Sequence, residues 1–126
     1  MIRNSVFCLA IGILSQSAFA DFAGEWDQKT ALEKMKSPDV VVIDVRSPEE
    51  YAEGHVPGAI NIPHNQMDEH QDTLSSLKGK ELLLYCRSGR RAGMAESQLT
   101  EKGFENLYHL KGDMQGWLNA NRAVEK

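Results

Sequence analysis

The residues with the clearest chemical potential lie in one short stretch, Cys86-Arg87-Ser88-Gly89-Arg90-Arg91. A thiol becomes a nucleophile when it ionises, and neighbouring cations favour the ionised form. The N–H groups of a tight loop that enters a helix can bind an oxyanion, because they point toward it and the helix dipole favours negative charge. The stretch therefore predicts that Cys86 is a nucleophile and that its substrate carries negative charge.

The residues that follow the cysteine are the candidate binding residues. Arg87 and Arg91 are expected to bind the anionic end of the substrate and to stabilise the thiolate. Arg90 fits a solvated surface position equally well. Ser88 and Gly89 are expected to contribute backbone N–H groups and loop shape rather than side-chain chemistry.

A strand and a helix must hold this stretch in place. Residues 81–86 form an apolar run of the length of a buried strand, and residues 92–102 have helical spacing with Gly103 as the C-cap. Ser47-Pro48-Glu49-Glu50 has the pattern of a helix start, with serine at the N-cap and glutamate three residues later. The remaining expected elements are helices at 26–36 and 112–120, either one helix or a loop plus a helix at 64–78, and strands at 39–45, 59–62 and 104–110.

Apolar strands that alternate with helices predict an α/β fold, with a mostly parallel central sheet and helices on both faces. Parallel sheets of this kind bind their ligands at the carboxyl ends of the strands. Cys86 falls at such an end, directly after the apolar run. The expected fold and the expected nucleophile are therefore consistent with each other.

The length and charge of the chain limit its function further. Its 126 residues are enough for one compact domain. A formal net charge of −4 argues against nucleic acid or an anionic membrane as the main partner. His64, His70 and His109 do not have the spacing of metal ligands, so no metal is expected.

The first 20 residues have the features of a cleaved signal peptide. Arg3 precedes an apolar segment at residues 6–14, and residues 18–20 (Ala-Phe-Ala) form a small-x-small cleavage site. A membrane anchor is the alternative, but the apolar segment is short for a bilayer span. The mature chain would begin at Asp21, reside in a bacterial periplasm and make no membrane contact.

Cleavage would leave Cys86 as the only cysteine of the mature chain. It would also remove Arg3, which leaves 13 basic against 18 acidic residues and a net charge of −5. A lone thiol forms no intramolecular disulfide and is a liability in an oxidising compartment unless it is buried or used. The neighbouring arginines indicate that the Cys86 thiol takes part in chemistry.

Three blocks of the chain resemble the signature blocks of single-domain rhodaneses. They are residues 44–51 (Asp-Val-Arg-Ser-Pro-Glu-Glu-Tyr), 54–63 (Gly-His-Val-Pro-Gly-Ala-Ile-Asn-Ile-Pro) and 85–92 (Tyr-Cys-Arg-Ser-Gly-Arg-Arg-Ala). The blocks occur in the order of that family and at its approximate spacing. The resemblance covers nearly the whole mature chain, and three spaced blocks are far more specific than any one of them.

The resemblance implies a rhodanese-like domain at residues 21–126 and a thiosulfate sulfurtransferase. In the implied mechanism the Cys86 thiolate attacks the outer sulfur of thiosulfate, sulfite leaves, and the persulfide passes its sulfur to cyanide or a thiol. The N–H groups of the loop would stabilise negative charge as an oxyanion hole does. The implied partners are a small-molecule sulfur donor and acceptor, with a thiol protein as a further acceptor, and the chemistry needs no metal or organic cofactor.

The resemblance also bears on residues outside the cysteine loop. Asp44 and Arg46 are expected to form a structural ion pair at the end of a buried strand. His55 is expected to be a hydrogen-bonded structural residue rather than a general base, since a thiolate that is already formed needs no base. The family often has two glycines before the last helix, where this chain has Gly112-Asp113. Asp113 thus places a carboxylate where a bare backbone is expected.

Two other functions stay open. A protein-to-protein sulfur relay would use the same persulfide but would turn over free thiosulfate poorly. A cysteine phosphatase or arsenate reductase also surrounds an oxyanion with a loop cysteine and an arginine, separated by five residues. Here four residues separate Cys86 from Arg91, and Ala92 stands where a phosphatase has its arginine. The narrower loop suits a sulfur atom better than a tetrahedral phosphate.

Overall fold

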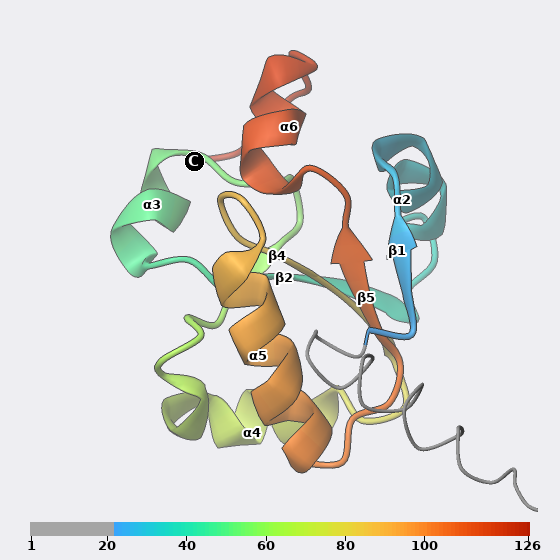
Figure 1. The fold of residues 1–126 in the computed structure, drawn as a ribbon, viewed down its shortest axis with the longest axis vertical. Coiled ribbons are helices and arrows are strands. Elements are labelled where there is room, and N and C mark those ends of the chain that lie inside the picture. The colour runs from blue at the N-terminus through green and yellow to red at the C-terminus, as the bar shows by residue number, and fades with distance from the viewer. Residues whose placement is uncertain (1–21) are drawn as a thin grey trace, which may run out of the picture.

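The computed structural model describes residues 22–126, and the expected signal peptide lies outside these described residues. Five parallel strands form one sheet in the order β1-β5-β4-β2-β3 (Figure 1). The strands are β1 (Gly24–Trp26), β2 (Val40–Asp44), β3 (Ile60–Asn61), β4 (Glu81–Tyr85) and β5 (Leu107–Leu110). The prediction of a mostly parallel sheet is confirmed.

The helices connect the strands and cover both faces of the sheet. They are α2 (Gln28–Lys34), α3 (Pro48–Glu53), the 3-10 helix η2 (Met67–His70), α4 (Gln71–Ser76), α5 (Arg90–Glu101) and α6 (Asp113–Asn119). Helix α3 begins with the predicted capping box: the Ser47 side chain accepts the Glu50 N–H, and the Glu50 side chain accepts the Ser47 N–H. Local sequence alone thus accounts for the start of this helix.

The core has two parts, one on each face of the sheet. Alternate residues of β4 point to opposite faces, as in any strand. Leu82 and Leu84 pack into the part that α4 and α5 complete, whereas Leu83 and Tyr85 pack into the part that α2 and α6 complete. All four side chains are fully buried. Strand β4 lies in the middle of the sheet, and the cysteine follows directly at its carboxyl end.

Two segments differ from the expected elements. Trp26 was expected in the first helix but belongs to β1, where it pairs with Leu110 and its ring stacks on Tyr108 with centroids 4.4 Å apart. A strand of three residues is too short to show the alternation of apolar and polar side chains that predicts a strand. Its pairing partner, β5, lies near the other end of the chain. Helix α2 starts only after Asp27, whose side chain accepts the Thr30 N–H.

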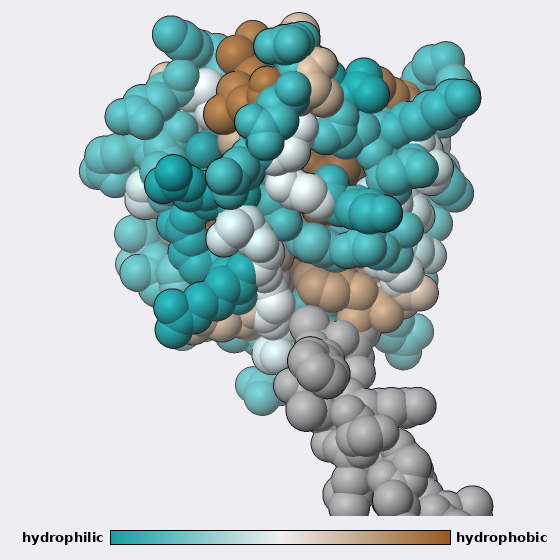
Figure 2. Space-filling view, turned by 45° about the horizontal axis from the view of Figure 1, so that its top comes forward, coloured by the Kyte–Doolittle hydropathy of each residue, from teal (hydrophilic) through white to brown (hydrophobic). Residues whose placement is uncertain are grey.

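Cys86, the predicted nucleophile, lies at the carboxyl edge of the sheet, directly after β4. Figure 1 shows the loop after β4, the start of α6 and helix α3 meeting at this edge. The face seen in Figure 2 is largely hydrophilic, with apolar groups in small patches. No helix within residues 22–126 is long and apolar enough to cross a membrane.

Candidate active site

The loop after β4 holds Cys86 at the floor of an open cavity. The side chain is only 1% exposed. Its Sγ accepts the N–H of Gly89 at 3.0 Å, so the loop closes over the sulfur. Gly89 has φ of +113° and precedes the first residue of α5. Only a glycine adopts this backbone conformation without strain, so the tight turn depends on Gly89.

The cavity has a volume of about 380 Å³, and cationic side chains surround the cysteine. Its lining consists of His64, Cys86, Arg87, Ser88, Arg90, Arg91 and Met94. The cavity thus brings together all of the predicted binding residues except Gly89, which instead contacts the sulfur through its backbone N–H. A small anion that enters it would meet both the sulfur and the arginines.

The three arginines do not stand in equal positions. Arg91 forms a two-point ion pair with Glu50 of α3, at 2.6 Å and 3.1 Å. This hydrogen bond is the main reason that the pKa of Glu50 is lowered to about 2. Arg87 and Arg90 are exposed and form no ion pair with any carboxylate of residues 22–126.

The start of α6 holds the backbone of the cysteine loop from behind. The N–H of Met114 donates to the carbonyl of Cys86 at 2.9 Å, and the N–H of Gln115 donates to the carbonyl of Arg87 at 3.2 Å. The carboxylate of Asp113 accepts the N–H of Cys86 at 3.1 Å. The start of α6 therefore fixes the cysteine at both its N–H and its carbonyl.

Asp113 occupies the position where the resemblance to rhodaneses implies a glycine. Its φ of +56° lies in the left-handed region, which aspartate tolerates better than most residues. Its side chain is buried beneath the loop and contacts the ring of His109, with Nε2 at 3.0 Å and 3.1 Å from the two carboxylate oxygens. The other ring nitrogen of His109 lies 2.8 Å from Glu25 on β1.

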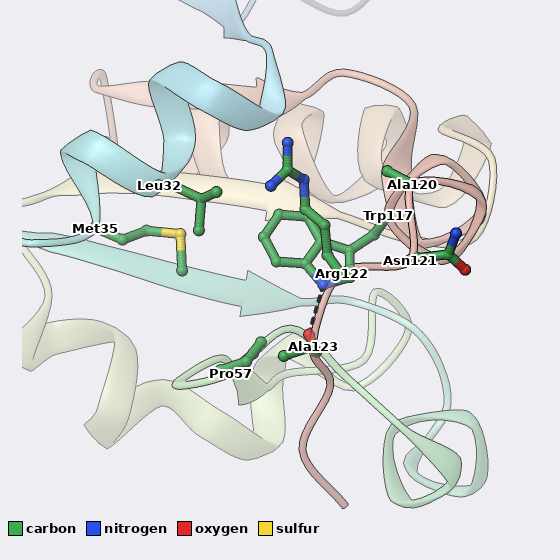
Figure 3. Close-up of a pocket in the computed structure, with 8 residues that line it drawn as sticks. All are labelled: Leu32, Met35, Pro57, Trp117, Ala120, Asn121, Arg122 and Ala123. Atoms are coloured by element: carbon green, nitrogen blue, oxygen red, sulfur yellow. Dashed lines mark hydrogen bonds between the residues drawn. The ribbon is translucent and has the colours of Figure 1, made fainter.

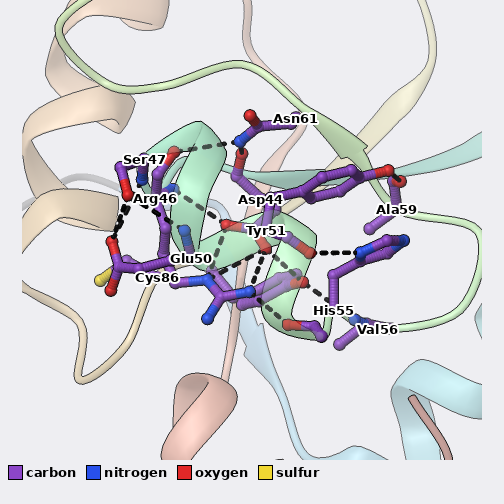
Figure 4. A network of polar contacts seen from close by, with 12 residues as sticks. Asp44, Arg46, Ser47, Glu50, Tyr51, His55, Val56, Ala59, Asn61 and Cys86 are labelled. Atoms are coloured by element: carbon purple, nitrogen blue, oxygen red, sulfur yellow. Dashed lines mark hydrogen bonds and ion pairs between the residues drawn. The ribbon is translucent and has the colours of Figure 1, made fainter. Parts of the chain in front are cut away.

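A second polar network lies behind the first, centred on the buried carboxylate of Asp44 (Figure 4). Arg46 contacts both oxygens of Asp44 at 2.7–3.0 Å and donates to the carbonyl of Gly54. The hydroxyl of Tyr85 donates to Asp44 at 2.7 Å and accepts the N–H of Val56. This network ties β2 and β4 to the turn at residues 54–58.

His55 lies in that turn and is not part of the lining of the Cys86 cavity. Its Nδ1 lies 2.8 Å from the carbonyl of Tyr51, and its ring stacks on Tyr51 with centroids 3.6 Å apart. Its backbone pairs with Glu125 near the C-terminus. These contacts fit a structural residue.

A separate cavity of about 260 Å³ lies between α2 and the C-terminal segment (Figure 3). It is lined mainly by apolar groups: Leu32, Met35, Pro57, Trp117, Ala120, Asn121, Arg122 and Ala123. None of the predicted site residues is among them. Although this cavity is the more apolar of the two, the reactive groups of the described chain gather in the other one.

Sequence reasoning missed three residues of the site: Glu50, His109 and Glu25. Glu50 was assigned only to a helix start, and His109 was considered only as a metal ligand. The available signal was the aspartate at a glycine position, four residues after His109. Residues 22–126 contain no group of three or more potential ligands that could hold a metal ion.

Comparison with known proteins places most of the described chain in one family. A family model described as Rhodanese-like domain matches residues 27–120. A thiosulfate:glutathione sulfurtransferase of Saccharomyces cerevisiae is 34% identical over 93 residues, covering 65% of this chain and 67% of the yeast protein. A thiosulfate sulfurtransferase of Escherichia coli is 40% identical over 70 residues, covering 56% of this chain and 67% of its own.

Other relatives differ in length and description. A tRNA uridine(34) hydroxylase of Hamiltonella defensa is 37% identical over 84 residues, and the match spans 64% of this chain but only 24% of the hydroxylase. An uncharacterised protein of Synechocystis is matched over 52% of its length. Among solved structures, a protein of Lactobacillus plantarum superimposes with a TM-score of 0.72 at 25% identity, covering 94% of this chain and 98% of its own.

Proposed function

The chain belongs to the rhodanese-like domain family, and on this basis we propose that it is a sulfurtransferase that uses thiosulfate as donor and Cys86 as the sulfur carrier. The sulfurtransferases among its relatives support this class of enzyme. The observation that carries the proposal is the position of the Cys86 sulfur, which accepts the Gly89 N–H on the floor of an arginine-lined cavity.

The proposed reaction has two steps. The Cys86 thiolate attacks the outer sulfur of thiosulfate, a new sulfur–sulfur bond forms, and sulfite leaves with the electrons of the bond that breaks. An acceptor nucleophile then attacks the outer sulfur of the persulfide, and Cys86 leaves as a thiolate. With cyanide the product is thiocyanate, and with a thiol it is a new persulfide. The first step moves the negative charge from the cysteine sulfur to the outer sulfur of the persulfide, and the second step regenerates the Cys86 thiolate.

The loop and the arginines have distinct proposed roles. The Gly89 N–H stabilises negative charge on the cysteine sulfur in the thiolate. Arg87, Arg90 and Arg91 line the cavity and bind the sulfonate end of the donor, which competes with Glu50 for Arg91. Ser88 contributes to the shape of the loop through its backbone. Asp44, Arg46 and His55 support the loop without touching the substrate.

The test is the intact mass of the mature protein before and after incubation with thiosulfate, and again after cyanide. We expect a gain of one sulfur atom that maps to Cys86 and is removed by cyanide with release of thiocyanate. The matched control is Cys86→Ser, a nearly isosteric change that should gain no mass while keeping its melting temperature. A Cys86→Ser variant that still transfers sulfur would overturn the assignment of the nucleophile.

The acceptor class is the second part of this proposal. We propose a small thiophile, cyanide or a low-molecular-weight thiol, rather than a dedicated protein relay, because the cavity is open to solvent. Steady turnover with free thiosulfate and a small thiol supports this assignment. A persulfide that forms but is discharged only by a thiol protein would favour the relay instead.

We also propose that the protein is exported to a bacterial periplasm. The support is the N-terminal sequence: a basic residue, a short apolar segment and the Ala18-Phe19-Ala20 cleavage motif. Cell fractionation followed by N-terminal sequencing tests this point. We expect a periplasmic chain that begins at Asp21, and a full-length chain in the cytoplasm would contradict the proposal.

A further inference from the structure

His109 lies between two carboxylates directly behind the cysteine loop. Its Nε2 faces Asp113 and its Nδ1 faces Glu25, at 3.0 Å and 2.8 Å. A neutral imidazole has a single N–H and can donate to only one of these acceptors, whereas an imidazolium donates to both. The geometry therefore favours the protonated ring.

The surroundings of His109 act in opposite directions on its charge. Burial disfavours a charged ring, but the hydrogen bonds to Asp113 and Glu25 outweigh burial, and the pKa of His109 is raised above its usual value. The other groups that face the ring are uncharged: the aromatic ring of Phe22, with centroids 5.3 Å apart, and the backbone of Gly89. Glu25 is half-exposed and connects this buried pair to solvent.

Asp113 links the histidine to the nucleophile. The same carboxylate that contacts His109 accepts the backbone N–H of Cys86 at 3.1 Å. Asp113 is also close to Gly89: a Cβ placed on that glycine would lie 3.2 Å from the carboxylate. A negative charge here disfavours a second negative charge on the cysteine sulfur, unless a neighbouring cation offsets it.

The arginines beside the cysteine loop do not offset the charge of Asp113 in place of His109. Arg91 is already paired with Glu50, and Arg87 and Arg90 lie at the lining of the open cavity, where solvent screens them. His109 is the cation in direct contact with Asp113 among the described residues.

We propose that His109 and Asp113 are positioning residues for Cys86. The Asp113 carboxylate fixes the cysteine backbone, and the proton on His109 offsets the charge of that carboxylate so that the sulfur can carry negative charge. Because Asp113 stands at a glycine position, the reactivity of the Cys86 thiol depends on the charge of His109. This proposal rests on the proposed function for the identity of the nucleophile, but its test does not require sulfur transfer.

The test is the rate at which Cys86 reacts with iodoacetamide, measured from about pH 5 to about pH 8, where histidine titrates. The reagent is uncharged, so the arginines do not attract it, and its rate reports the thiolate fraction. In His109→Gln the charge of Asp113 is no longer offset, and we expect the rate at neutral pH to fall by about tenfold. The matched control is His70→Gln, which changes a histidine of η2 that is not part of the cavity lining and should leave the rate unchanged.

Asp113→Asn separates an electrostatic role from a structural one. Asparagine keeps an acceptor for the Cys86 N–H but removes the charge, so this variant should react at least as fast as the wild type. The double variant His109→Gln/Asp113→Asn should recover most of the rate lost in His109→Gln. An unchanged rate in His109→Gln, or a double variant as slow as His109→Gln, would overturn the proposal. Failure of sulfur transfer with these alkylation results intact would count against the proposed function alone.

Discussion

The guanidinium of Arg91 is held by the carboxylate of Glu50, with Nη1 2.6 Å from Oε1 and Nη2 3.1 Å from Oε2. The arginine comes from the first turn of α5, beside the cysteine, and the glutamate comes from the first turn of α3. Glu50 therefore has two tasks, as a member of the α3 capping box and as the partner of a cavity-lining cation. An anionic donor must compete with Glu50 for Arg91.

Glu50→Gln should improve the binding of thiosulfate. Glutamine keeps the capping box but removes the charge that neutralises Arg91. Because the pair is partly exposed, we expect the KM for thiosulfate to fall by roughly two- to fivefold. Glu49→Gln is the matched control, since Glu49 is an exposed neighbour on the same helix. A KM that is unchanged or higher in Glu50→Gln would show that Arg91 serves the loop rather than the donor.

The same pair predicts a specific loss of stability in acid. The pKa of Glu50 is lowered from 4.5 to about 2 in the folded protein, chiefly by its hydrogen bond with Arg91. A carboxyl with a lowered pKa contributes its stability fully above its unfolded value, and this contribution disappears as pH falls through the folded value. Wild type should exceed Glu50→Gln by about 0.5 to 1 kcal/mol at pH 7. Urea denaturation should show this difference vanishing between pH 4.5 and pH 2, and a difference independent of pH would contradict the assignment.

Tyr85→Phe should destabilise the protein by about 2 kcal/mol, because it leaves a buried backbone N–H and a buried carboxylate each short of a partner. The hydroxyl donates to Asp44 and accepts the N–H of Val56. Tyr108→Phe is the control, as its hydroxyl makes no hydrogen bond within residues 22–126. Chemical denaturation gives the free energy of unfolding of both variants. Equal losses would show that the Tyr85 hydroxyl is not needed for the network.

Gly89→Ala should disable the cysteine loop. The φ of +113° costs a non-glycine residue about 1 to 2 kcal/mol, and the new Cβ would lie 3.2 Å from Asp113. We expect slower alkylation of Cys86 as well as lower stability. Gly79→Ala is matched to it, with a positive φ but no atom within 4 Å of the added Cβ. Both variants should melt below the wild type because of the positive φ, and only Gly89→Ala would change the thiol reactivity. Normal reactivity in Gly89→Ala would contradict the role assigned to the turn.

Much of the fold follows from patterns within a few residues of each other. The capping box joins residues three positions apart, and the β-branched run at residues 40–44 forms the predicted strand. The apolar run at residues 81–85 predicts both a buried strand and the place of Cys86 at its end. Strand β1 was missed because three residues are too few to show an alternation of apolar and polar side chains. Its assignment depends on its pairing with β5.

The sequence by itself determined the parallel α/β architecture and predicted Cys86 as the nucleophile with its cationic neighbours, because each depends on residue type and short-range spacing. Only the tertiary structure decided which charges face one another. Cys86 and Asp113 are 27 residues apart, Glu50 and Arg91 are 41 apart, and Glu25 and His109 are 84 apart. These contacts arise because the strand order β1-β5-β4-β2-β3 brings distant strand ends to one edge of the sheet. Local propensity contains no information on that order, which is set by the burial of both faces of the sheet.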